Sequence, residues 1–239
     1  MAELATVRNT RRRGIGDMLR SEKVREAAAK LGIAGICLFL CLGAVFRLVT
    51  VLDRAPPQGL DALSATQIFT IVCQTIFYLL VLWFTLIRRT AVRRASGWKP
   101  RVVAAVGAFS IFGFGLLPPA QGLGLGWHIA AASLLLASAA LAMLVLPYLG
   151  RSFSLMSEAR GLVTRGPYRV VRHPLYLVEE LAAIAGFIEA FSLAAALLLA
   201  LQLAFQIRRI LNEEAVLEAS FPDYARYKAR TARVIPGIW

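Results

Sequence analysis

The sequence predicts an all-α, polytopic transmembrane helix bundle, and three observations support this fold class. First, 58% of the 239 residues are hydrophobic and only 17% are charged, whereas about a quarter of the residues are charged in ordinary soluble domains. Second, apolar segments close to the roughly 20 residues that cross a bilayer as a helix recur along the chain. Third, basic residues gather in alternate connecting segments. We expect about six crossings.

The first 149 residues predict a basic segment followed by four transmembrane helices. Residues 1–30 are polar and basic, and we expect this N-terminal segment to be cytoplasmic, with an interfacial helix over Ser21–Lys30. Residues 31–149 carry the four transmembrane helices, the third of which is ended by two prolines. These helices are predicted at Leu31–Leu52, Gln67–Ile87, Val102–Leu117 and Trp127–Leu149.

A fifth apolar stretch, Tyr176–Ile207, is too long for a single crossing. Glu189 interrupts it near the middle, and a carboxylate is costly in the hydrocarbon region. The stretch therefore predicts two short helices, about 176–188 and 191–207, in a hairpin that crosses and returns.

The distribution of charge predicts the topology. The net charge is +13, and much of it lies near the two ends of the chain and in Arg88–Arg101 and Gly150–Arg172. The intervening segments Asp53–Thr66 and Pro118–Gly126 are not basic. This alternation places both termini in the cytoplasm and makes the bilayer, not nucleic acid, the partner of the basic residues. The richness in Arg and Ala favours a bacterial inner membrane, with the endoplasmic reticulum as the alternative.

The cysteines do not indicate a metal site. Cys37, Cys41 and Cys73 all lie inside apolar segments, without a CxxC motif or histidine-rich partners. We expect them to be packing residues, and we expect no metal centre.

The chemically informative residues lie in the last third of the chain. The hairpin brings the segment Arg160–Tyr176 close to Arg209 and Glu213, which share one helix face because they are four residues apart. Glu179 and Glu180 begin the hairpin at membrane depth, where ionisable groups pair or line a cavity. An interfacial belt of salt bridges and aromatic side chains is the alternative explanation.

These residues resemble the isoprenylcysteine carboxyl methyltransferase and phospholipid methyltransferase superfamily. The shared pattern is Leu-Val-Thr-x-Gly-Pro-Tyr-x-x-x-Arg-His-Pro-x-Tyr, found here from Leu162 to Tyr176. It continues with Glu213-Glu214 and with a tail that contains Phe221, Tyr224, Tyr227, Arg230 and Ile235-Pro-Gly. The resemblance covers about residues 150–239, which it identifies as a C-terminal catalytic region with a cofactor loop, a helical hairpin and a tail helix.

The resemblance implies S-adenosylmethionine as cofactor, in a pocket open to the cytoplasm. A strand-like segment, Arg160–Val163, would offer its backbone to the cofactor, and Glu213 would pair with the cofactor's amino group. Arg209 would bind the carboxylate of the acceptor, so Arg209 and Glu213 are the expected catalytic residues. The full set implied to bind cofactor is Arg160, Gly161, Leu162, Val163, Tyr168, His173, Pro174, Leu175, Tyr176 and Glu213.

The reaction that the resemblance favours is carboxyl O-methylation of a prenylcysteine-like substrate, a lipophilic small molecule or a prenylated partner. N-methylation of a phospholipid or another lipid is the alternative, with Glu179, Glu180 or Glu214 as candidate base. Two further hypotheses are an NADPH-dependent isoprenoid or sterol reductase and a membrane protein without enzymatic activity. The sequence does not predict the oligomeric state.

Overall fold

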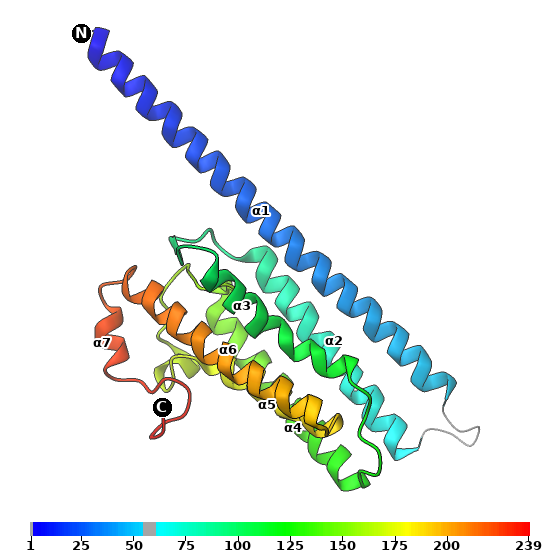
Figure 1. Cartoon of the computed structure of the whole chain (residues 1–239). Coiled ribbons are helices and arrows are strands. Elements are labelled where there is room, and N and C mark those ends of the chain that lie inside the picture. Colours follow the sequence, from blue (N-terminus) through cyan, green and yellow to red (C-terminus); the bar gives the residue numbers. More distant parts are fainter. Residues whose placement is uncertain (1, 55–60) are drawn as a thin grey trace.

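The structure is a computed structural model that describes the backbone of residues 2–54 and 61–239, and the side chains of these except residues 2–21, 62 and 63. It confirms the all-α fold class (Figure 1). The helices within these residues are α1 Ala2–Asp53, α2 Ala62–Ile87, α3 Lys99–Phe109, α4 Leu125–Leu149, α5 Pro174–Glu189, α6 Leu193–Glu218 and α7 Tyr224–Lys228.

Short 3₁₀ turns and one small sheet complete the fold. The turns are η1 Ser110–Leu116, η2 Gly150–Ser152 and η3 Gly166–Arg169. Strand β1, Arg93–Arg94, pairs antiparallel with β2, Glu158–Ala159, so that Arg93 lies opposite Ala159. The strand-like segment expected at Arg160–Val163 is therefore displaced: the strand lies just before it. The backbone bonds to β1 and its flanks come from Ser157 and Ala159, which accept from Ala95 and Val92 at 3.1 and 2.7 Å.

Five helical segments are long and apolar enough to cross a membrane, which identifies an integral membrane protein. They are Glu22–Asp53, Ser64–Ile87, Lys99–Leu116, Leu125–Ser152 and Leu193–Glu218. Helix α5 has 16 residues and is shorter than these five. With α6 it forms the predicted hairpin, which turns between Glu189 and Leu193.

Two helices are longer than the apolar pattern predicts. Helix α1 starts at Ala2, so Ser21–Lys30 is helical but continuous with the first apolar segment. Helix α6 continues for three turns past Ile207 and carries Arg209 and Glu213. Hydropathy marks only the part of a helix that suits lipid, whereas polar residues such as Glu and Arg extend a helix readily into water.

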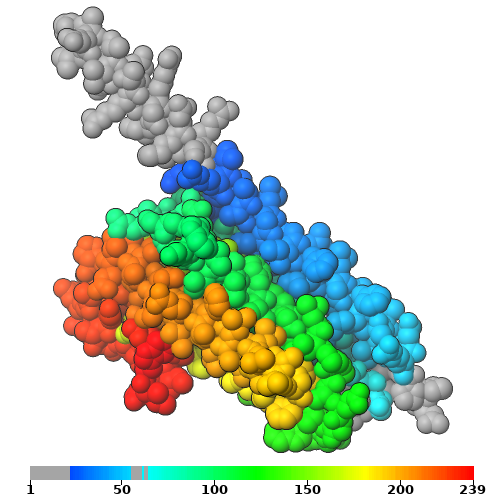
Figure 2. Space-filling model, viewed as in Figure 1, coloured from blue at the N-terminus to red at the C-terminus, as the bar shows by residue number. Residues whose placement is uncertain are grey.

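The helices pack in a simple order. Helix α1 lies along α2, α2 packs on α4, and α4 packs on α5. Helix α5 then contacts α6 and η1, and α6 packs on α3 (Figures 1 and 2). Pro174 starts α5 at a first-turn position, where the missing N–H is harmless. Ser192 caps α6 by accepting from the Ala195 amide at 3.1 Å. The hairpin thereby places the start of α5 beside the end of α6.

Candidate functional site

A polar pocket lies where the start of α5 meets the polar end of α6. It has about 430 Å³ of empty space, part of which is open to solvent. Charged and aromatic side chains share its wall with a few aliphatic ones. The lining residues are Leu149, Ser152, Glu158, Arg160, Gly161, Leu162, Val163, Tyr168, Arg172, His173, Glu213, Leu217, Tyr224 and Tyr227.

Backbone hydrogen bonds hold the C-terminal segment against the start of α5, beside this pocket. The segment Arg172-His173 donates its amides to the carbonyls of Ala232 and Arg233, at 2.9 and 3.0 Å. The C-terminal segment therefore runs beside the start of α5. The Tyr227 hydroxyl donates to the Tyr168 carbonyl at 2.7 Å and fixes α7 against η3. These contacts bring together residues that are about 60 positions apart in the sequence.

The turn that precedes Tyr168 requires glycine. Gly166 has a φ of +60°, and a Cβ at this position would lie 2.3 Å from the Tyr148 ring. We expect Gly166→Ala to lower the free energy of unfolding by about 1–3 kcal/mol, through both left-handed strain and overpacking. Thermal unfolding in detergent would measure this loss. In a Tyr148→Ala background only the strain remains, so the penalty should shrink to about 1 kcal/mol; an unchanged penalty would argue against the ring contact.

The two neighbouring glutamates of α6 have different surroundings. Glu214 is buried and accepts from Arg172 at 2.8 Å and from Arg233 at 3.0 Å. Its remaining close partner is the His173 ring, at 3.3 Å. Glu213 forms no ion pair with any residue that the structure describes, and it accepts a hydrogen bond from the Tyr176 hydroxyl. Glu213 is thus the pocket carboxylate that is open to a cationic ligand, whereas Glu214 anchors the C-terminal segment.

Two buried polar atoms at the pocket have no hydrogen-bond partner among the described residues. They are the Tyr224 hydroxyl and the Arg160 Nε. Burial raises the pKa of Tyr224, and it raises the pKa of Tyr227 to about 12, so both hydroxyls stay protonated at neutral pH. Unsatisfied buried groups are costly unless a ligand or water meets them. These free donors, the aromatic faces and Glu213 fit a zwitterionic nucleoside such as S-adenosylmethionine.

A second, apolar cavity lies between α1, α2, α3, η1, α4, α5 and the segment that follows η2, with about 570 Å³ of empty space. Its wall is mainly aliphatic and aromatic, and Glu179 is the one charged residue in it. The lining residues are Ile33, Ile36, Cys37, Leu40, Phe77, Tyr78, Val81, Ala108, Phe109, Ile111, Phe112, Leu146, Phe153, Leu155, Leu175 and Glu179.

A continuous chain of contacts joins the two cavities. Tyr176 donates its hydroxyl to Glu213 at the polar pocket. The Arg209 guanidinium lies over the Tyr176 ring, 4.7 Å from the ring centroid. Arg209 also donates to Glu179 at 2.9 Å, and Glu179 lines the apolar cavity. Arg209 is buried, and its Nε has no partner among the described residues.

The structure distributes the predicted site residues over three places. Arg160, Gly161, Leu162, Val163, Tyr168, His173 and Glu213 line the polar pocket. Leu175 lines the apolar cavity, while Tyr176 and Arg209 lie between the two cavities. Pro174 contributes the start of α5.

Sequence reasoning missed several residues that line or support the pocket. Tyr224 and Tyr227 were recognised only as part of the tail pattern, although both line it. Glu26 was not singled out at all. Its only signal is that it is one of two carboxylates, with Glu22, in the mainly basic stretch Ser21–Lys30 that leads into the first apolar segment.

The fold and the two cavities define a class of protein: a helix bundle with membrane-spanning helices, in which a polar pocket and an apolar cavity are linked by a chain of side-chain contacts. Residues 126–219 match the model of the isoprenylcysteine carboxyl methyltransferase (ICMT) family. The match confirms the resemblance seen in the sequence for this part of the chain, which is less than half of its length, and it suggests a membrane methyltransferase. The matched residues include α5, α6 and most of the lining of the polar pocket.

Two curated relatives are similar to part of the chain. The cobalt-zinc-cadmium resistance protein CzcN of Cupriavidus metallidurans is 36% identical over 78 residues, which is 32% of this chain and 36% of the relative. The nickel-cobalt-cadmium resistance protein NccN of Alcaligenes xylosoxydans xylosoxydans is 34% identical over 83 residues, covering 34% of this chain and 38% of the relative. The chain thus spans little more than a third of the length of these relatives. Within the described residues, no group of three or more His, Cys, Asp or Glu side chains is arranged to hold a metal ion.

Proposed function

We propose that this protein transfers a methyl group from S-adenosylmethionine to a lipophilic acceptor, most simply the carboxylate of a prenylcysteine-like substrate. The observation that carries the proposal is the contact chain from Glu213 through Tyr176 and Arg209 to Glu179. This chain joins a polar pocket suited to a nucleoside to an apolar cavity suited to an isoprenoid or acyl chain. The family match independently supports methyl transfer.

The residues divide into two groups with different roles. When bound, S-adenosylmethionine supplies an electrophilic methyl group that is transferred by in-line displacement. Glu213 would hold the amino group of this cofactor, and Tyr168, Tyr224 and Tyr227 would enclose its uncharged parts. The apolar cavity would hold the acceptor's chain and exclude water. Alignment of two reactants in this way can contribute several kcal/mol, up to about 7–11 kcal/mol in favourable cases.

The charges of Arg209 and Glu179, between the two cavities, affect which chemical class of acceptor fits. A carboxylate is already a nucleophile and needs no base, and the free Nε–H of Arg209 is a donor for it. A lipid amine would instead have to lose a proton, and Glu179 is the carboxylate that lines the apolar cavity. Glu179 already neutralises Arg209, so N-methylation of a lipid amine remains the second candidate function. Glu214 is a poor candidate for this base because two arginines hold it at the C-terminal segment.

The distribution of charge and the composition also support an orientation and a location in the cell. We infer that the polar pocket and both termini face the cytoplasm, because the basic connecting segments lie on that side of the bundle. The composition supports a bacterial inner membrane. The acceptor would then reach the apolar cavity from the bilayer, since the cavity lies between membrane-spanning helices.

Binding of the cofactor product tests the proposal directly. We expect saturable binding of S-adenosylhomocysteine to the detergent-purified protein in a calorimetric titration, with NADPH giving no heat of binding. Binding of NADPH alone would move the protein to the reductases. If neither compound binds, the polar cluster is an interfacial belt of salt bridges and the methyltransferase proposal fails.

A further inference from the structure

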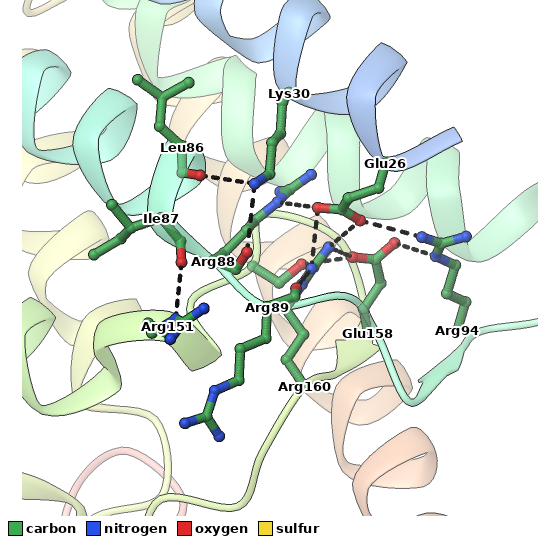
Figure 3. A network of polar contacts seen from close by, with 11 residues as sticks. Glu26, Lys30, Leu86, Ile87, Arg88, Arg89, Arg94, Arg151, Glu158 and Arg160 are labelled. Atoms are coloured by element: carbon green, nitrogen blue, oxygen red, sulfur yellow. Dashed lines mark hydrogen bonds and ion pairs between the residues drawn. The ribbon is translucent and has the colours of Figure 1, made fainter. Parts of the chain in front are cut away.

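A buried carboxylate of α1 supports the polar pocket from outside its lining. Glu26 is only 5% exposed, although α1 lies at the edge of the bundle and its residues from Glu22 to Arg25 are exposed. Three arginines converge on this one carboxylate (Figure 3). Arg88 donates at 2.7 Å, Arg94 at 3.1 Å, and Arg160 donates through both terminal nitrogens at 3.1 and 3.0 Å.

The three arginines come from segments that follow other helices. Arg88 immediately follows α2, Arg94 belongs to β1, and Arg160 follows β2. A second carboxylate, Glu158, pairs with Arg94 and Arg160. Next along α1, Lys30 donates to the Leu86 carbonyl at 2.7 Å, which adds a further tie to the end of α2 (Figure 3). The cluster therefore joins α1 to the loop that leads into the pocket.

Arg160 belongs both to this cluster and to the wall of the polar pocket. Its guanidinium is completely buried, it donates to the Arg89 carbonyl and to both glutamates, and the residue lines the polar pocket. Arg172, the other arginine of the lining, pairs with Glu214, which Arg233 shares. Glu26 and Glu158 together leave the three arginines of the cluster with an excess of one positive charge. Without Glu26 the excess would double, next to a pocket proposed to receive a cation.

We propose that Glu26 is a positioning residue of the polar pocket: it holds Arg160 in the wall and neutralises it, so that a positively charged cofactor is tolerated there. This inference rests on the proposed function, because it assigns Glu26 a role toward S-adenosylmethionine. The cofactor carries a sulfonium charge that its product, S-adenosylhomocysteine, lacks. Glu26 should therefore matter more for a cationic ligand than for the uncharged thioether.

The test compares two ligands on the same variants. Sinefungin carries an ammonium group close to the position of the sulfonium, whereas S-adenosylhomocysteine has a neutral sulfur. Their Kd values are measured by calorimetry on the full-length protein in detergent, so no turnover is needed. For Glu26→Gln we expect the affinity for sinefungin to fall about fivefold more than the affinity for S-adenosylhomocysteine, since the charge interaction acts in a partly buried site. An equal loss for both ligands, or no loss, would overturn the proposal.

A matched control is available one turn earlier on α1. Glu22→Gln removes the same charge from an exposed position, and we expect the ratio of the two affinities to stay within twofold of the wild-type value. If Glu22→Gln changes the ratio as much as Glu26→Gln does, the effect comes from the net charge of α1. It would then not come from the contact between Glu26 and Arg160.

Variants of Arg160 test whether Glu26 acts through Arg160. They also keep the proposal testable if Glu26→Gln does not fold. Arg160→Gln removes the positive charge that Glu26 offsets, so the ratio should shift in the opposite direction, in favour of sinefungin. The double variant should return the ratio toward the wild-type value. A ratio in the double variant equal to that of Glu26→Gln alone would show that Arg160 is not the intermediary. A wild-type protein that binds neither ligand would instead reject the methyltransferase function itself.

Discussion

Replacement of Glu213 by Gln is expected to reduce the affinity for S-adenosylhomocysteine about 10- to 100-fold. Glu213 is the one carboxylate of the polar pocket that forms no ion pair among the described residues. A charge-assisted hydrogen bond to a ligand's ammonium group is worth about 1.5–3 kcal/mol, which corresponds to this range of affinity. Calorimetric titration of the purified variant measures the change.

Glu218→Gln is the matched control for that variant. It makes the same change on the same helix, but Glu218 is exposed, and its only partner among the described residues is Lys228, in an exposed ion pair at 3.3 Å. Such pairs contribute little, about 0–1 kcal/mol, so we expect the affinity to stay within about twofold. Equal affinities for Glu213→Gln and the wild type would show that Glu213 does not hold the cofactor.

Replacement of Arg209 by Gln is expected to lower kcat/KM for a prenylcysteine carboxylate about 100-fold and to change the Kd of S-adenosylhomocysteine less than threefold. Arg209 touches Tyr176 and Glu179 but not the polar pocket itself. Loss of a guanidinium that binds a carboxylate costs roughly 3 kcal/mol. Methylation of N-acetyl-S-farnesylcysteine from labelled S-adenosylmethionine measures the effect. Equal losses of acceptor use and cofactor binding would contradict this division of roles.

Arg209→Gln also leaves Glu179 buried without its ion-pair partner, although Gln206 still donates a hydrogen bond to it. Breaking a buried ion pair in this way can destabilise a protein by about 3–5 kcal/mol. The double variant Arg209→Gln with Glu179→Gln removes both charges and is the control for folding. Glu179→Gln alone separates the two candidate acceptors. For a carboxylate acceptor it removes a repulsive charge, so KM should fall or stay the same. For a lipid amine it removes the base, so kcat should fall about 100-fold or more.

Much of the candidate site could be predicted from local sequence. The run from Leu162 to Tyr176 contains a glycine that a left-handed turn requires and a proline suited to a helix start, and both features appear in the structure. The hairpin was predictable because its apolar stretch is too long for one crossing and an acidic residue interrupts it. Given the hairpin, the proximity of Tyr176 to Arg209 and Glu213 followed from helix geometry.

Contacts between distant segments could not be predicted in the same way. Glu213 and Glu214 are adjacent in the sequence, yet one is left to the pocket and the other is held by Arg172 and Arg233. Adjacent residues on a helix point about 100° apart, and only the packing of the C-terminal segment determines which of the two it covers. The apolar cavity likewise depends on how α1, α2 and α3 meet α5, which no periodicity specifies.

The sequence by itself determined the membrane location, the hairpin and the methyltransferase resemblance, because these depend on hydropathy and on spacing within short segments. Only the tertiary structure decided that Glu26 of the first helix reaches Arg160, 134 positions later, and that Arg209 is neutralised by Glu179. The physical reason is that a buried charge must be compensated. The sequence shows which residues are charged and would need a partner when buried. Which residue becomes that partner depends on the segments that the folded chain brings together.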